Sequence, residues 1–84
     1  METEIYKRNI ATSIKKRVVE LRARGKKTSK DELISLAAIG RTLDPPVSRV
    51  TVYQVINGNS ESRRVKEAVE RELGQVYWVR KNAA

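Results

Sequence analysis

The chain contains neither Cys nor His, and this absence most narrows what its 84 residues can fold into. Without Cys no disulfide can staple the chain, and without Cys or His the common zinc sites cannot form. A chain of this length buries only about 60% of the surface that it exposes when unfolded. The core must therefore rest on hydrophobic packing alone, within a single domain that spans residues 1–84.

The same absence argues against an enzyme. His is the commonest general base, although carboxylates and Lys remain available. The chain also lacks a Gly-rich phosphate loop and a pair of carboxylates at a spacing that suggests a cleft. We expect no catalytic residues, no metal and no cofactor.

No segment of the chain looks like a membrane anchor or a secretion signal. There is no apolar run of about 18 residues, the length that a membrane-spanning helix needs. The sequence begins METEIYKRN, which lacks the apolar stretch of a signal peptide. We therefore expect a cytoplasmic protein of a bacterial or host cell, without a membrane partner.

Basic side chains are in clear excess, with 18 Lys and Arg against 10 Asp and Glu and a net charge of +8 at pH 7. The excess lies mainly in residues 1–42, which carry 11 basic and 5 acidic side chains, against 7 and 5 in residues 43–84. A basic surface attracts polyanions, because neutralised phosphates release condensed counterions. A solvated helix face has the same composition, so the charge suggests nucleic acid as a partner without establishing it.

The first helix is expected at about residues 9–24. Apolar residues recur there at spacings of four, four and three, the pattern of an amphipathic helix: Ile10, Ile14, Val18 and Leu21. Gly25 stands just after the helix, where a left-handed residue commonly ends it. Residues 1–8 fit either an extension of this helix or a flexible basic arm.

A second helix is expected at about residues 30–43. Ser29 followed by Glu32 has the spacing of a capping box, which marks a helix N-terminus. Asp44-Pro45-Pro46 stops the helix, because proline lacks the backbone N–H and disfavours helical geometry in the residue before it. Four residues are expected to face inward: Leu33, Leu36, Ala37 and Gly40.

Two further helices are expected at about residues 48–56 and 61–73. Ser48 is a suitable N-cap for the third helix, and the turn Asn57-Gly58-Asn59 ends it. Gly74 closes the fourth helix. The inward-facing residues are Val52, Val55 and Ile56 in the third helix, and Val65, Ala68, Val69 and Leu73 in the fourth.

The tail, residues 75–84, contains four residues that suit a short strand: Val76, Tyr77, Trp78 and Val79. A single strand cannot satisfy its own backbone, so the tail must pair with something or dock as an irregular arm. Either Trp78 covers the core of its own chain, or residues 76–79 pair with a second copy as a dimer contact. The whole pattern predicts an all-α fold of four helices with a short extended C-terminal tail.

The second and third helices carry the most information on function. They are joined by a short turn, the geometry in which the later helix enters the major groove of DNA. Arg can bond guanine O6 and N7, Gln can bond adenine N6 and N7, and Val can contact the thymine methyl group. An ordinary polar helix face would look similar. The residues left exposed on the third helix are Arg49, Val50, Thr51, Tyr53, Gln54 and Asn57.

Residues 47–58, with the sequence VSRVTVYQVING, resemble the recognition-helix segment of lac-repressor-type regulators, which reads approximately V-S-x-x-T-V-S-R-V-L-N-G. Residues 35–43, SLAAIGRTL, are similar to the preceding helix in the lambda-repressor-like superfamily. The order of elements is similar to that of small phage regulators of the Cro, Ner-like and phage-repressor kind. The resemblance implies a helix-turn-helix DNA-binding domain.

The resemblance also implies roles for single residues. Base reading falls on Arg49, Val50 and Gln54. Phosphate contacts, which fix register rather than sequence, fall on Ser48, Thr51, Tyr53 and Asn57. Lys30 is a further candidate for a phosphate contact.

The chain departs from that family in two respects. Asp44-Pro45-Pro46 makes the turn about two residues longer than usual, which could rotate the recognition helix and change the side chains that reach the bases. No lac-type hinge helix or sugar-binding domain follows, so no small-molecule inducer is expected.

The leading hypothesis is a sequence-specific regulator of transcription: a phage or prophage repressor, associated with the nucleoid, that binds double-stranded operator DNA and blocks a promoter. It would act as a homodimer that matches two half-sites about 34 Å apart. The alternative is an architectural, excisionase-like recombination factor that bends DNA. RNA binding is disfavoured because the aromatic residues are scattered, and an antirepressor or other partner protein stays open.

Overall fold

The computed structural model describes the backbone of residues 2–78 and the side chains of residues 10–78. Its helices are α1 (Glu2–Ala23), α2 (Leu36–Arg41), α3 (Arg49–Ile56) and α4 (Arg63–Leu73). Within residues 2–78, β structure is limited to an isolated antiparallel bridge between Lys27 and Leu33. The predicted all-α fold of four helices is confirmed.

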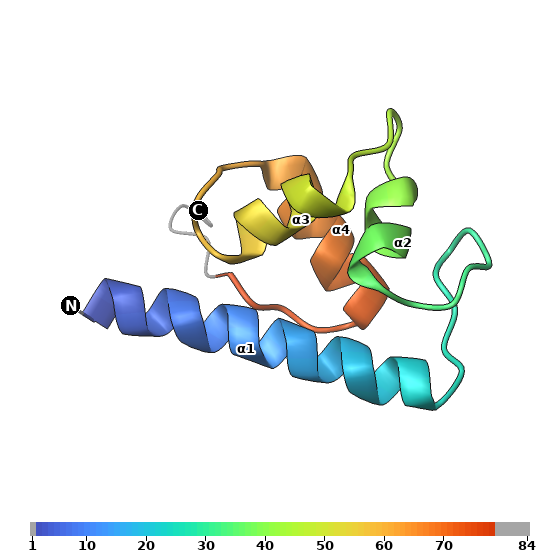
Figure 1. Cartoon of the computed structure of the whole chain (residues 1–84), viewed down its shortest axis with the longest axis horizontal. Helices are drawn as coiled ribbons and strands as arrows, with labels where there is room; N and C mark the ends of the chain where they lie inside the picture. Colours follow the sequence, from blue (N-terminus) through green and yellow to red (C-terminus); the bar gives the residue numbers. More distant parts are fainter. Residues whose placement is uncertain (1, 79–84) are drawn as a thin grey trace, which may run out of the picture.

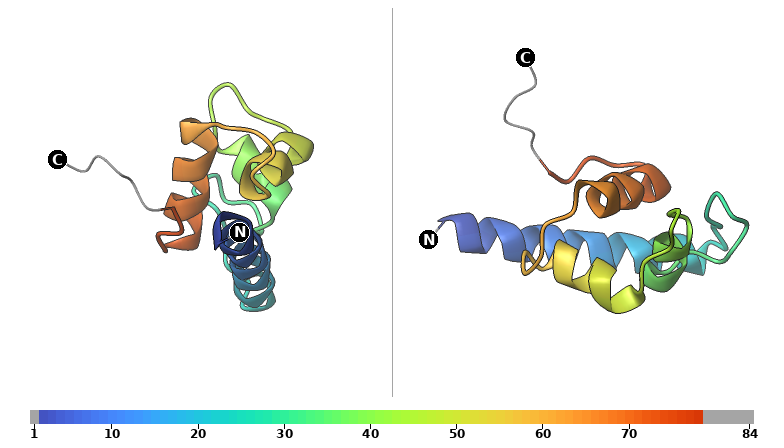
Figure 2. Two further views of the ribbon diagram at one scale, coloured as in Figure 1. Left: turned by 90° about the vertical axis from the view of Figure 1, so that its left-hand side faces the viewer. Right: turned by 90° about the horizontal axis from the view of Figure 1, so that it is seen from above.

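α1 is the longest helix and runs along one side of the molecule, with the other three packed together above it in the view of Figure 1. Viewed along α1, α4 lies on one side and α2 and α3 lie on the other (Figure 2, left). Buried side chains of all four helices form one hydrophobic cluster, which Ile34 and Tyr77 join from segments outside the helices. The core therefore lies where the shorter helices meet residues 10–21 of α1.

The predicted apolar stripe of α1 is confirmed. Its members are each at most 8% exposed: Ile10, Ile14, Val18 and Leu21. The backbone is helical from Glu2, so residues 2–8 extend the helix and do not form an arm. Gly25 follows with φ 77°, a left-handed conformation that glycine adopts without a steric penalty.

The predicted start of the second helix is wrong. α2 begins after Ser35, whose Oγ accepts a hydrogen bond from the backbone N–H of Ala38 (3.0 Å). Ser29 caps no helix, because its backbone N–H and its hydroxyl both donate to the carboxylate of Glu72 on α4. The capping-box spacing after Ser29 is a local pattern, and a contact with a distant residue overrides it.

The later start changes which residues of this segment are buried. Gly40 is buried as predicted, but Leu36 and Ala37 are only partly buried. Leu33 lies in the loop before α2 and is 41% exposed, because its bridge to Lys27 sets its direction instead of a helix. Three other residues of this segment are buried instead, with no solvent exposure: Ile34, Ala38 and Ile39.

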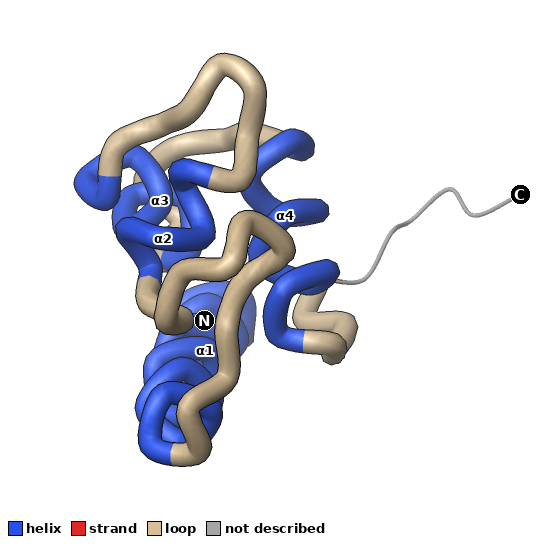
Figure 3. Tube along the Cα trace, turned by 90° about the vertical axis from the view of Figure 1, so that its right-hand side faces the viewer, coloured by secondary structure: helices blue, strands red, loops and turns tan. Residues whose placement is uncertain are grey.

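The loop between α1 and α2, residues 24–35, lies across one end of the molecule between α2 and α4 (Figure 3). Its turn is held by Thr28, whose Oγ1 accepts a hydrogen bond from the backbone N–H of Lys30 (3.2 Å). Glu32 forms an ion pair with Arg41 of α2 (3.0 Å). The loop is therefore tied to the helices on both of its sides.

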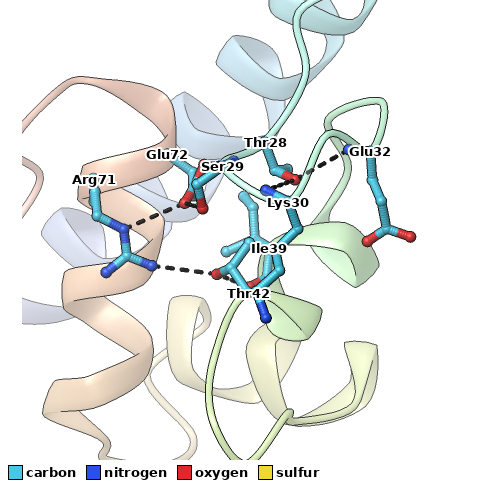
Figure 4. A network of polar contacts seen from close by, with 8 residues as sticks. All are labelled: Thr28, Ser29, Lys30, Glu32, Ile39, Thr42, Arg71 and Glu72. Atoms are coloured by element: carbon cyan, nitrogen blue, oxygen red, sulfur yellow. Dashed lines mark hydrogen bonds and ion pairs between the residues drawn. The ribbon is translucent and has the colours of Figure 1, made fainter.

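Glu72 is the buried carboxylate that joins this loop to α4 (Figure 4). It accepts hydrogen bonds from the backbone N–H of Ser29 (3.0 Å), from the Ser29 hydroxyl (2.7 Å) and from Arg71 Nε (3.2 Å). Arg71 also donates to Thr42 Oγ1 (3.3 Å), whose hydroxyl donates to the carbonyl of Ile39 (2.6 Å). Burial raises the pKa of Glu72, but the hydrogen bonds from Ser29 and the bond and charge of Arg71 outweigh it, so this pKa lies below its ordinary value of 4.5.

The predictions for the third and fourth helices are confirmed. Ser48 caps α3 through the N–H of Thr51 (3.2 Å), and Ser62 caps α4 through the N–H of Val65 (3.3 Å). Gly74 ends α4 in the left-handed conformation, with φ 69°. The inner residues are at most 2% exposed: Val52, Val55 and Ile56 in α3, and Val65, Ala68, Val69 and Leu73 in α4.

The turn between α2 and α3, residues 42–48, folds back against Gly40. The backbone N–H of Val47 donates to the carbonyl of Gly40 (3.1 Å). A Cβ at residue 40 would collide with the carbonyl oxygen of Val47 and lie 3.2 Å from Cγ2 of Val52. The absence of a side chain at Gly40 therefore lets the turn and α3 pack directly on α2.

Gly40→Ala is expected to lower the free energy of unfolding by about 1–3 kcal/mol, the usual cost of overpacking a filled site. In an unhindered helix the same substitution would stabilise the protein by about 0.5–1 kcal/mol. Urea denaturation followed by circular dichroism measures the difference. A variant at least as stable as the wild type would show that Val47 does not lie against Gly40.

Glu72→Gln is expected to lower the free energy of unfolding by about 1–3 kcal/mol at neutral pH, because a buried, charged acceptor is lost. Since the pKa of Glu72 is lower in the folded chain, its contribution is complete above pH 4.5 and is lost as the pH falls through the folded pKa. Denaturation at a series of pH values should therefore show the gap between wild type and variant shrinking below pH 4.5.

Glu67→Gln is the matched control for this series, because it neutralises an exposed carboxylate of the same helix. Its stability relative to the wild type should change little with pH. A gap between wild type and Glu72→Gln that stays constant or widens in acid would contradict the stabilising role of the Glu72 carboxylate.

Candidate nucleic-acid interface

α3 turns one face into the core and the opposite face to solvent. The inner face consists of Val52, Val55 and Ile56. Since successive residues of a helix are rotated by about 100°, the centre of the outer face falls at Val50 and Gln54. Val50 is 64% exposed and Gln54 is also exposed. Two of the three residues predicted to read bases thus lie at the centre of an exposed helix face.

Arg49, the third predicted base-reading residue, lies at one flank of this face. Its guanidinium carbon is 5.8 Å from the ring centroid of Tyr53, one turn further along α3. Lys15 of α1 reaches the same ring, with its Nζ 4.7 Å from the centroid. A cation over an aromatic face is attracted by the ring quadrupole. Tyr53, predicted to bind phosphate, is therefore a partly buried ring that holds two cations.

A shallow hollow of about 340 Å³ lies between α1, the start of α2 and α3. Its polar lining residues are Lys15, Ser35, Arg49 and Tyr53, and Val19 and Leu36 contribute to its apolar wall. The hollow extends the surface of α3 onto α1. Sequence patterns did not single out Lys15, because on α1 it is one of several exposed basic residues.

The other predicted phosphate contacts on α3 lie at its two ends. Ser48 accepts a hydrogen bond from the N–H of Thr51 and lies 3.2 Å from the Thr51 hydroxyl, so both side chains take part in capping. Asn57 is the C-cap at the other end and is partly buried. These residues bracket the exposed face along the helix axis, where phosphate contacts would set its register.

Lys30 does not join this face. It belongs to the loop of residues 24–35, and α2 lies between that loop and α3 in Figure 1 and in the right-hand view of Figure 2. The side chain of Lys30 is exposed. The structure therefore keeps Lys30 apart from the other predicted phosphate contacts.

Acidic side chains are sparse around α3. Between residues 33 and 60 the sequence contains Asp44 as its single acidic residue. In the described part of the chain, Lys15 and Arg49 belong to none of the ion pairs, which are Lys27–Asp31, Arg41–Glu32, Lys66–Glu61 and Arg71–Glu72. Within the described residues, Lys15 and Arg49 thus have no ion-pair partner beside α3, whereas Lys27, Lys66 and Arg71 each pair with an acidic residue.

The longer turn does not separate α3 from α2. In Figure 1 the turn projects away from the helices, and the carbonyl of Pro45 accepts a hydrogen bond from Arg64 Nη2 of α4 (3.1 Å). Val47 and Val52 both lie against Gly40. The additional residues are accommodated in the projecting part of the turn.

The C-terminal tail docks on its own chain. Residues 75–78 form no strand, so of the two alternatives for the tail the structure has the irregular arm. Oε2 of Glu70 accepts hydrogen bonds from the backbone N–H groups of Tyr77 (2.9 Å) and Trp78 (3.0 Å). Tyr77 is 8% exposed, and Trp78 is partly buried against the core with Nζ of Lys66 5.7 Å from its ring. The tail is an irregular arm held to α4.

Of the two predicted roles of Trp78, the structure has the one in which it packs on its own chain. Two backbone donors that a strand-paired dimer would use are occupied by Glu70. Val76 is 75% exposed, and Val79 lies outside the described residues. A dimer contact through the tail stays a prediction.

The described residues contain no cluster of three or more potential ligands placed to hold a metal ion. None of the helices α1 to α4 combines the length and the apolar character that crossing a bilayer requires.

Comparison of the chain with models of protein families, with curated proteins and with solved structures yields no match in any of the three. The resemblance of residues 47–58 to a lac-type recognition helix stays a prediction.

Proposed function

We propose that this protein is a sequence-specific regulator of transcription that binds double-stranded DNA through α3, in the manner of a phage or prophage repressor. One observation carries the proposal. Residues 47–58, which resemble a recognition helix, contain a capped helix whose outward face is exposed and free of acidic residues. The inward face of this helix packs on α2 across a turn, which supports a helix-turn-helix mode of binding.

The dimensions of α3 suit the major groove. An α-helix with its side chains is about 10–12 Å across, and the groove is about 12 Å wide. In the groove, Gln54 would bond N6 and N7 of adenine, and Val50 would contact the methyl group of thymine. Ser48, Thr51 and Asn57, at the ends of α3, would contact phosphates and set the register. The surplus of positive charge supplies salt-dependent affinity for any DNA, and the central side chains supply the preference.

One α3 reads too few base pairs to specify an operator, so the proposal includes a homodimer whose copies meet half-sites about 34 Å apart. A dimer bound across a promoter blocks transcription. The protein would then work in the cytoplasm of a bacterium or infected host cell, associated with the nucleoid. An antirepressor protein is compatible with this function, and a small-molecule inducer is not part of it.

Selection of bound sites from random double-stranded DNA tests the proposal, together with sedimentation of the protein with and without the selected site. A repressor of this kind should select a palindrome and place two chains on each site. DNase footprinting then distinguishes a palindrome that overlaps a promoter from tandem sites on bent DNA, which would support an architectural, excisionase-like factor instead. Enrichment of no motif would overturn sequence-specific binding.

Gln54→Ala is expected to relax the preference at one base-pair position, with a loss of discrimination of about 1–3 kcal/mol. Affinity for random DNA should change little, because the phosphate contacts remain. The measurement is a titration of the selected site and of a site mutated at that position. Gln75→Ala removes the same side chain from the exposed part of the tail and is the matched control. Equal discrimination by Gln54→Ala and the wild type would show that Gln54 reads no base.

A further inference from the structure

Arg49 and Lys15 bring two positive charges to one aromatic ring. The guanidinium carbon of Arg49 is 5.8 Å from the ring centroid of Tyr53, and the Nζ of Lys15 is 4.7 Å from it. The two cations come from α3 and α1, so they are neighbours only in the fold. Within the described residues neither forms an ion pair. Two neighbouring cations without an acidic partner leave a local excess of positive charge.

Arg49 also faces different surroundings from the other predicted base-reading residues. Its side chain lines the hollow of about 340 Å³ between α1, the start of α2 and α3, together with Lys15 and Tyr53. Val50 and Gln54 line no part of that hollow and lie opposite the buried face of α3. Arg49 is therefore turned toward the neighbouring helices, and the central pair is turned away from them.

The geometry of the major groove would give Arg49 a different contact from Val50 and Gln54. A helix that enters the groove nearly fills its width of about 12 Å. Side chains at the centre of its outward face then meet base edges, and side chains at a flank meet the sugar–phosphate wall. In helix-turn-helix complexes the first helix of the motif crosses that wall. The hollow lies at the start of α2. If α2 is that first helix, the cations of the hollow would face the DNA backbone.

We infer that Lys15, Tyr53 and Arg49 form a clamp for one sugar–phosphate unit of the DNA backbone, and that base reading is left to Val50 and Gln54. The inference rests on the proposed function. The phosphate lies between the two cations, and the ring of Tyr53 is a positioning group that holds both of them beside it. Arg49 thereby moves from the base-reading set to the phosphate-binding set.

The wall of the hollow suits the sugar as well as the phosphate. Val19 and Leu36 line it, and Val19 is 67% exposed although it is apolar. A deoxyribose ring presents mainly C–H groups between two phosphates, so it can cover these side chains while the phosphate meets the cations. The combination matches a backbone unit of DNA better than it matches a small inorganic anion.

The salt dependence of DNA binding tests the clamp, because each neutralised phosphate contributes about 0.9 to the slope of log K against log salt concentration for B-form DNA. Lys15→Gln and Arg49→Gln should each make this slope shallower, and because the two cations share one phosphate, the double variant should lose about 0.9 in total. Both variants should weaken binding to the selected site and to random DNA by the same factor. Titrations of wild type and variants at several salt concentrations give both quantities.

Lys16→Gln is the matched control. It removes the same charge from the same helix, but Lys16 is rotated by about 100° from Lys15 and lines no part of the hollow. Its salt slope should equal that of the wild type. A slope that falls equally in Lys15→Gln and Lys16→Gln would indicate diffuse attraction to the basic helix, and it would overturn the clamp.

Two variants of Tyr53 test its positioning role. Tyr53→Leu removes the aromatic ring, and Tyr53→Phe keeps the ring while removing the hydroxyl. If the ring positions the cations, the salt slope should become shallower in Tyr53→Leu than in Tyr53→Phe, with thermal unfolding confirming that both variants are folded. Equal slopes in the two variants would show that the ring has no positioning role.

Arg49→Gln separates failure of the clamp from failure of the proposed function. A loss of affinity confined to the selected site, with an altered preference at one base pair and an unchanged salt slope, would show that Arg49 reads a base. That result would overturn the clamp and leave the proposed function intact. Failure of the wild type to bind any double-stranded DNA would overturn both.

Discussion

The direction in which α3 faces depends on the contact between Gly40 and the turn that follows it. Because residue 40 has no side chain, the carbonyl of Val47 and Cγ2 of Val52 can lie directly over α2. Val52 and the other inner residues of α3 are then almost completely buried, and this packing determines which side chains point outward. The exposure of Val50 and Gln54 is therefore a consequence of how α3 is packed. Under the proposed function, buried residues that touch no DNA would determine which side chains face it.

The register of α1 links the core to the same surface. Ile14 and Val18 are buried, and the next residue after each, Lys15 and Val19, lies at the rim where α1 passes α3. Since the rotation per residue in a helix is constant at about 100°, the stripe that builds the core also determines which basic side chain reaches Tyr53. Changing that register would alter the core and the charged surface together.

Local signals and distant contacts differ in what the sequence could predict. The cap at Ser48 depends on a residue three positions on, and the pattern of neighbours was enough to predict it. Ser29 has the same local pattern, but it caps no helix because its backbone N–H donates to Glu72, 43 residues further along the chain. Periodicity left Val50 and Gln54 among the exposed residues of the third helix, whereas no pattern indicated that Lys15 of α1 reaches Tyr53 of α3. That contact depends on how two helices pack.

The ion pairs of the described residues are unevenly distributed: they lie along α4 and the loop before α2, and none involves Lys15 or Arg49. Along α4 and the loop before α2, acidic side chains pair with basic ones, and buried Glu72 binds both Ser29 and Arg71. Residues 33–60 contain one acidic residue, so nothing comparable offsets the cations held by Tyr53. Leaving like charges together does not stabilise the free protein, and an acidic neighbour would relieve the repulsion. Under the proposed function, this local excess of positive charge would attract DNA to the face that carries Lys15 and Arg49 before any specific contact forms. A phosphate bound between the two cations would relieve the same repulsion, so under the proposed function the charge pattern would favour the bound state over the free one.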